Sequence, residues 1–190
     1  MKLGAQYGYW TGEPRQDVIS VGIEAENLGY DSLWTGESYS SDAFTPLCWV
    51  GAHTNKIKLA TVIAQLGART PATLAMQAMT LDALSGGRFC LGIGVSGPQV
   101  IEGWHGQPFG KPLSRTKETI DIIRKILRRE DPVTADGPNL PLPYPKDAPN
   151  SWGLGKPLKL INRPLSPDIP IFLGAEGPKN IKLAFEECNG

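Results

Sequence analysis

The chain has 190 residues, of which 41% are hydrophobic and 20% are charged, as is ordinary for one soluble globular domain. Its 19 basic residues balance 19 acidic ones, so no excess of charge points to nucleic acid. No apolar run approaches the roughly 18 residues of a membrane span, and no signal peptide is visible. The three cysteines lack metal-ligand spacing. We therefore expect a cytoplasmic protein with reduced thiols, no metal and no membrane contact.

Short apolar segments alternate with segments of helical periodicity along the whole chain. The pattern predicts five strands and five helices in strict alternation. The strands are expected at 2–7, 31–36, 57–64, 88–95 and 169–174, and the helices at 15–28, 43–53, 72–84, 115–129 and 179–188. Such alternation predicts an α/β fold, in which helices cover a parallel sheet.

Local signals mark several of the expected helix ends. Gly29 is a typical C-terminal stop for the first helix. Thr70 and Pro71 mark the start of the third helix, with proline at the first helical position. Ser114 can cap the fourth helix, and its hydroxyl is of the type that N-caps favour.

Two architectures fit the alternation, an open doubly wound sheet and a (β/α)8 barrel. The first strand is not followed by a GxGxxG turn, which disfavours a dinucleotide-binding Rossmann domain. The strand 88–95 carries apolar residues on both faces, as a strand covered on both sides does. Small residues at its C-terminal end leave room for a ligand to approach the backbone.

The segment 131–168 breaks the alternation and holds nine of the seventeen prolines. A segment this long without regular structure is usually either functional or disordered, and its many apolar residues argue against disorder. We interpret it as an insertion between the fourth helix and the fifth strand. It would be either a lid or wall over a pocket, or a surface arm packed on the domain or on a partner subunit.

Three stretches resemble the luciferase-like flavin- and deazaflavin-dependent oxidoreductases, most closely the branch that uses coenzyme F420. They are LGYDSLWTGE at 28–37, the segment 56–97 with its RTPA and SGGR motifs, and PIFLGAEGPKNIKLA at 170–184. The resemblance implies a TIM-type (β/α)8 barrel with its cofactor at the C-terminal ends of the strands. It implies hydride transfer between reduced F420 and a small organic substrate, with an FMN-dependent monooxygenase as the alternative.

About five βα units are present, so residues 1–190 are expected to form a single N-terminal part of such a barrel, with strands six to eight missing. A fragment of a longer protein is one interpretation, and a non-catalytic remnant is another. Five strands leave open edges at the first and fifth strands, because a barrel closes only with all its strands. We therefore expect homo-oligomers, most simply dimers.

The resemblance also implies cofactor contacts at three strand ends. A cis non-prolyl peptide is expected at about Ala64-Gln65, behind the cofactor ring, with an ordinary trans turn as the alternative. Ser96 and Gly97 would bond the polar edge of the ring or form a purely structural turn. The loop that carries Gly174, Ala175 and Gly177 opens a helix, whose free N–H groups suit the cofactor phosphate.

Candidate catalytic and substrate-binding residues lie at two further places. Glu37 and Ser38 follow the second strand, and many relatives carry a histidine where Ser38 stands. Serine can only form hydrogen bonds, so Glu37 could supply the proton if burial raised its pKa. The alternative is a carboxylate that is bonded to backbone donors or solvated. The substrate candidates are Gln99, Glu102 and His105, which are more often simple surface residues.

Overall fold

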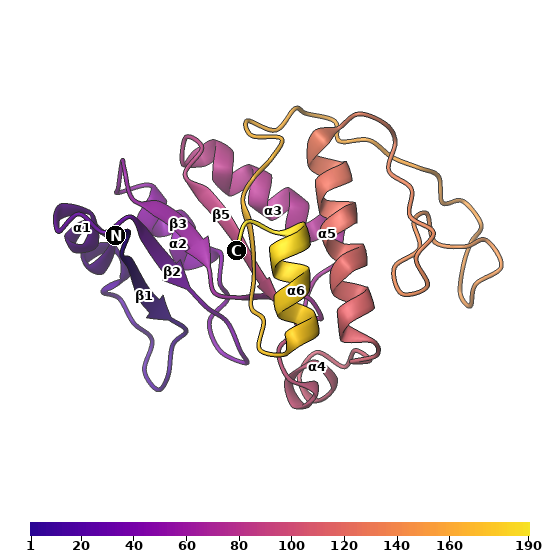
Figure 1. Cartoon of the computed structure of the whole chain (residues 1–190), viewed down its shortest axis with the longest axis horizontal. Coiled ribbons are helices and arrows are strands. Elements are labelled where there is room, and N and C mark those ends of the chain that lie inside the picture. Colours follow the sequence, from indigo (N-terminus) through magenta and orange to yellow (C-terminus); the bar gives the residue numbers. More distant parts are fainter.

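The computed structural model describes residues 1–190 and contains six strands and six helices (Figure 1). Every predicted strand and helix is present, and one short strand and one short helix are additional. The elements are β1 (Gly4–Gly8), α1 (Val18–Asn27), β2 (Ser32–Thr35), α2 (Thr45–Gly51), β3 (Lys58–Thr61), β4 (Ala64–Gln65), α3 (Pro71–Leu84), β5 (Phe89–Gly94), α4 (Pro98–Gly103), α5 (Pro112–Arg128), β6 (Ile171–Leu173) and α6 (Pro178–Glu187). None of the helices combines the length and apolar character needed to cross a membrane.

All strand pairs are parallel, as the alternation predicts. The order runs β1, β2, β3, β5, and β6 lies on the other side of β5. β4 pairs with β5 beyond the point where β3 leaves it, so β3 and β4 are two parts of one interrupted strand. The open edges are therefore β1 and β6, the predicted first and fifth strands. Asn189 and Gly190 form backbone hydrogen bonds with the outer side of β6.

The interruption corrects the predicted place of the unusual peptide bond. The cis non-prolyl bond joins Val62 to Ile63, two residues before the expected Ala64-Gln65. Ala64 and Gln65 instead continue the sheet by pairing with β5. The expected strand 57–64 is consequently split, and its irregular backbone falls between the two paired parts.

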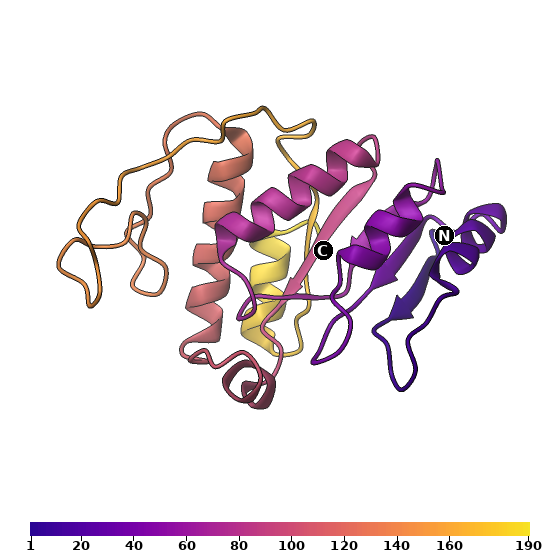
Figure 2. The ribbon, with the colours of Figure 1, turned by 180° about the vertical axis from the view of Figure 1, so that it is seen from behind.

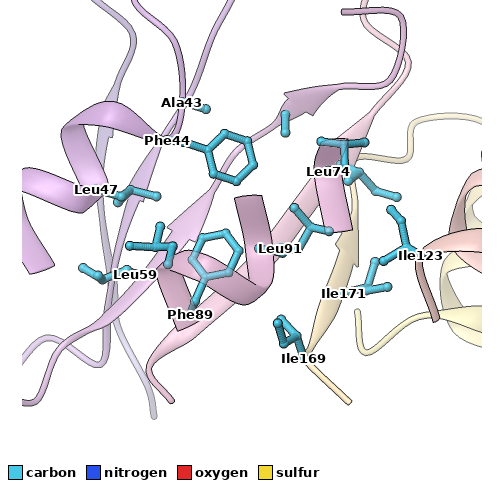
Figure 3. Packing of buried hydrophobic residues seen from close by; sticks show 14 of the residues in the cluster. Ala43, Phe44, Leu47, Leu59, Leu74, Phe89, Leu91, Ile123, Ile169 and Ile171 are labelled. Carbon is cyan, nitrogen blue, oxygen red and sulfur yellow. The ribbon is translucent and has the colours of Figure 1, made fainter. Parts of the chain in front are cut away.

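The main core lies between the sheet and its helices, and 30 buried residues form one cluster (Figure 3). Successive residues of a strand point to opposite faces, so alternate apolar residues of β3, β5 and β6 turn toward the helices. Leu59, Leu91 and Ile171 of these strands are fully buried, and Leu74 and Ile123 approach from α3 and α5. A single continuous core therefore fixes the strand ends relative to one another.

The sequence predicted an N-cap residue for α3 and for α5, and only the cap of α3 is confirmed. The Thr70 hydroxyl accepts a hydrogen bond from the N–H of Thr73 at 3.2 Å, so it caps α3 as predicted. The predicted cap of α5 is wrong: the N-cap is Lys111, and Ser114 lies in the first turn, where its hydroxyl bonds Glu118 at 3.1 Å. Pro112 begins the helix earlier because proline suits its first position.

The proline-rich segment between α5 and β6 contains no helix or strand, only two isolated bridges. Both ribbon views show it extending beyond α5, away from the sheet (Figures 1 and 2). Together with α3 and α5 it encloses an apolar hollow of about 560 Å³. The segment is therefore one wall of this hollow, on the outer side of the helices, and it does not lie over the strand ends.

Candidate active site

The C-terminal ends of the strands meet at one edge of the sheet, because all strands run in the same direction. The ribbon views show the strand arrowheads pointing to the end of the molecule where α4 lies (Figures 1 and 2). The loops after β2, β3, β5 and β6 converge here, and they carry the predicted site residues. We call this edge of the sheet the strand-end site.

Glu37 is held rigidly at the start of the loop after β2. Its carboxylate forms a bidentate ion pair with Arg69, and it also accepts the backbone N–H groups of Gln65 at 2.7 Å and Ala43 at 3.1 Å. Only 6% of the Glu37 side chain and 13% of the Arg69 side chain are exposed. These surroundings match the structural alternative for Glu37, which is a carboxylate bonded to backbone donors.

Gln65 connects three of the predicted residues and is completely buried. Its side-chain amide donates to the backbone carbonyls of Glu37 at 3.1 Å and Ser38 at 3.0 Å. Its side-chain oxygen lies 3.1 Å from the Nε2 atom of His105. The structure therefore brings Glu37, Ser38, Gln65 and His105 into one hydrogen-bonded group.

Ile63 follows the cis bond and packs over the ends of β5 and β6. A side chain on Gly94 would lie 3.1 Å from Ile63, and one on Gly174 would lie 3.0 Å from it. Glycine at these two strand ends therefore makes room for Ile63. The neighbouring Val62 is 38% exposed. The sequence analysis missed Val62, Ile63 and Arg69, although the small residues at the strand ends were a usable signal.

The loop after β5 has an unusual backbone. Ser96 has a φ of 58°, in the left-handed region, and Gly97 is the N-cap of α4. Gln99 and Glu102 are exposed on α4, and the Glu102 carboxylate accepts the Phe109 N–H at 3.4 Å. The structure thus places these residues at the same end of the sheet, but not within the hydrogen-bonded group around Gln65.

The loop after β6 leads into α6 with its backbone donors uncovered. Gly177 is the N-cap, and no side chain forms a capping hydrogen bond. A side chain at Gly177 would meet nothing within 4 Å, so the space in front of the helix is open. The first N–H groups of a helix lack partners within the helix and favour an anion.

A separate cluster of polar groups involves Tyr7 of β1 and the loop that follows this edge strand. The Tyr7 hydroxyl donates to Asp17 at 2.7 Å, and the Arg15 guanidinium lies 4.0 Å above the Tyr7 ring. Burial and the hydrogen bond to Asp17 raise the pKa of Tyr7 to about 12. Hydrogen bonds from Arg15 and Tyr7 lower the pKa of Asp17 to about 2. These groups hold the loop between β1 and α1.

Comparison with known proteins places this arrangement in a family. The family model for luciferase-like monooxygenases matches residues 3–190. The chain is 55% identical over 190 residues to a putative coenzyme F420-dependent oxidoreductase of Mycobacterium tuberculosis, covering all of this chain and 54% of that relative. It is 34% identical over 167 residues to 5,10-methylenetetrahydromethanopterin reductase of Methanolobus tindarius, covering 87% of this chain and 46% of the relative.

Among solved structures, the coenzyme F420-dependent tetrahydromethanopterin reductase of Methanopyrus kandleri superposes with a TM-score of 0.80 at 25% identity. The match covers 100% of this chain and 54% of the reductase. The chain thus spans about half the length of the relatives it matches. The similarity confirms the prediction of an incomplete (β/α)8 barrel.

Proposed function

Because the chain belongs to the luciferase-like monooxygenase family, we propose that it forms the cofactor-binding part of an F420-dependent oxidoreductase. The reaction would be hydride transfer between the deazaflavin cofactor and a small organic substrate. The 55% identity to the mycobacterial relative named as F420-dependent carries this proposal. The aligned region includes every residue of the strand-end site.

The residues of the strand-end site fit such a cofactor. A deazaflavin ring needs an apolar support, and exposed Val62 with Ile63 supplies one at the interrupted strand. The ring also needs polar partners at its edge, for which Ser38, Ser96 and Gly97 are the proposed donors. Ala64 and Gln65 are both fully buried, and they would support the interrupted strand behind the ring.

The phosphate-bearing part of the cofactor is proposed to lie at the start of α6. Gly174, Ala175 and Gly177 present backbone to an open space there, and no side chain occupies the helix N-terminus. The partial positive charge of the helix end favours a phosphate. Glu176 is exposed, so its carboxylate can turn to solvent.

Bound at this edge, reduced F420 would supply a hydride to a substrate carbon. The contribution of the protein is to position the substrate and to exclude water around it. We propose that Gln99 and Glu102 of α4 contact the substrate beside the ring. Glu37 is proposed to support the loop that carries Ser38, because its carboxylate is already occupied by Arg69 and backbone donors.

The partner is proposed to be a second copy of the chain. The exposed part of α3 carries no charged residue and includes Thr73, Met76, Thr80 and Leu84. It lies between the 560 Å³ hollow and a second hollow of about 380 Å³ toward α2. A ridge between two hollows can pack against its own copy across a two-fold axis.

Fluorescence titration of the purified chain with F420 and, separately, with FMN tests the proposal. Saturable binding of F420 that is tighter than binding of FMN is expected. Tighter binding of FMN would favour the flavin monooxygenase alternative. Binding of neither cofactor would contradict the proposed function and favour a non-catalytic remnant. Light scattering on the same sample reports whether the chain is a dimer.

A further inference from the structure

Large apolar side chains are exposed in the segment 131–168, although hydrogen bonds tie this segment to α5. Trp152 is 90% exposed and Leu154 is 80% exposed. Tyr144 and Ile161 of the same segment are exposed as well. Single exposed apolar residues are common on protein surfaces, but a cluster of them marks a contact with something outside the fold. The segment therefore has the surface of a docking site.

Residues 143–156 form a compact loop, which we call the tip. Its two ends lie side by side, because a side chain on Gly155 would lie 3.5 Å from the Tyr144 carbonyl oxygen, and one on Gly153 would lie 4.0 Å from the Lys146 Cβ atom. The tip belongs to the orange segment that projects beyond α5 in both ribbon views (Figures 1 and 2). Its aromatic, aliphatic and lysine side chains therefore share one small projecting part of the molecule.

Positive charge is concentrated beside these apolar side chains. Residues 144–163 contain four basic residues and one acidic residue, so their net charge is +3, whereas the whole chain has no net charge. The basic residues are Lys146, Lys156, Lys159 and Arg163, and the acidic residue is Asp147. None of the four basic side chains forms an ion pair. Their charges therefore remain available to an anionic partner.

We propose that the tip docks on an anionic lipid surface. Tryptophan and tyrosine suit the boundary between lipid and water, because each joins an apolar ring to a polar group. Lysine side chains attract anionic headgroups while their aliphatic stems cover apolar surface. Protein interfaces are enriched in arginine and depleted in lysine. The three lysines and one arginine beside the tip therefore favour a layer of headgroups over a protein partner.

Surface docking does not require a membrane-spanning segment. The expectation of no membrane contact rested on the absence of an apolar run long enough to span a bilayer. A short exposed apolar stretch beside basic residues is enough to hold a protein at the surface of a bilayer. The tip contains no residue of the strand-end site or of α3, so this inference depends on neither the cofactor nor the second copy.

Co-sedimentation with lipid vesicles tests the apolar part of the inference. The purified 190-residue chain is mixed with vesicles of phosphatidylglycerol and phosphatidylcholine, or of phosphatidylcholine alone, and the bound fraction gives a partition coefficient. Trp152→Ser combined with Leu154→Ser removes the apolar side chains of the tip. Trp49→Ser combined with Leu28→Ser is the matched control, since both of these residues are exposed and lie outside the segment. Thermal unfolding checks that each variant folds.

A second pair of variants tests the charged part. Lys146→Glu combined with Lys156→Glu reverses two charges of the tip. Lys2→Glu combined with Lys179→Glu makes the same change in net charge at two exposed residues outside the tip. If the tip is the docking site, the first variant loses binding and the second keeps it. Raising the salt concentration should also weaken binding of the wild type, because salt screens the attraction to the headgroups.

The wild type should bind the anionic vesicles roughly tenfold more tightly than the neutral ones, and each tip variant should lose roughly tenfold in partition coefficient. Both controls should stay close to the wild type. No binding to anionic vesicles would overturn the inference. Unchanged binding of the Trp152→Ser, Leu154→Ser variant would also overturn it, since the attraction would then be charge alone. If the tip variants instead abolish self-association in light scattering and no vesicle binds, the tip is an interface between copies and the lipid assignment is wrong.

Discussion

Trp34 and Phe172 meet edge to face, with ring centroids 5.5 Å apart, although β3 and β5 separate their strands. Such a contact between β2 and β6 requires the sheet to curl around the two rings. The small Gly4 lies beside Trp34 on β1, where a side chain would come within 2.7 Å of the indole nitrogen. The six strands therefore have the curvature of a barrel wall.

Replacing Phe172 with leucine should lower the free energy of unfolding by about 1–2 kcal/mol, because it removes an aromatic pair and part of its buried surface. Phe185→Leu on α6 is the matched control, since Phe185 is 86% exposed. Urea denaturation measures both variants. A loss in Phe185→Leu as large as that in Phe172→Leu would show that the contact does not stabilise the curved sheet.

Glu37→Gln should cost about 3–5 kcal/mol of stability, because it leaves the largely buried Arg69 guanidinium without its counter-charge. The exposed pair Asp121 and Lys125 offers a control at 2.7 Å, and Asp121→Asn should cost less than about 0.5 kcal/mol. Thermal unfolding of both variants and the wild type measures the two losses of stability. Equal effects would mean that the Glu37 pair is no more stabilising than a surface pair.

The lowered pKa of Asp17 predicts how this carboxyl group behaves at low pH. A carboxyl group with a lowered pKa stabilises the folded state fully above its ordinary pKa of 3.8, and this contribution is lost as the pH falls through about 2. Carbon NMR of the Asp17 carboxyl should show it still ionised near pH 3. Arg15→Gln removes the main cause, so the midpoint should rise toward 3.8. An unchanged midpoint would exclude Arg15 as the cause.

Gly177→Asp separates cofactor binding from folding. Aspartate is a favourable N-cap, so α6 should be as stable as before or more so, while its charge opposes a phosphate in front of the helix. F420 affinity should fall at least tenfold. Gly177→Ser supplies a cap without the charge, so its affinity should fall much less. Similar affinities in Gly177→Asp and wild type would place the phosphate elsewhere.

Most of the fold was predictable because its signals are local. Apolar runs indicated all the main strands, and Thr70 with Pro71 correctly marked the start of α3. The split between β3 and β4 was not predictable from the run 57–64, since it depends on where each part meets β5. The short helix α4 was also missed, because its six residues are too few to show a helical period.

The site could be predicted only as a set of strand ends. The positions of Ser38, Ser96 and Gly174 followed from the rule that loops after parallel strands share one edge. The partners of these residues did not follow, because they are distant in the sequence. Gln65 meets His105 across 40 residues and Arg69 meets Glu37 across 32, and only the folded chain brings them together.

The most direct test of a cofactor site at the strand ends is an amide chemical-shift map of the 190-residue chain with added F420. We predict that the largest changes fall in the loops after β3, β5 and β6, around Val62, Ser96 and Gly177. Residues of α1 and of the segment 131–168 should change little. Binding that leaves these three loops unchanged and shifts the outer helices instead would contradict the account.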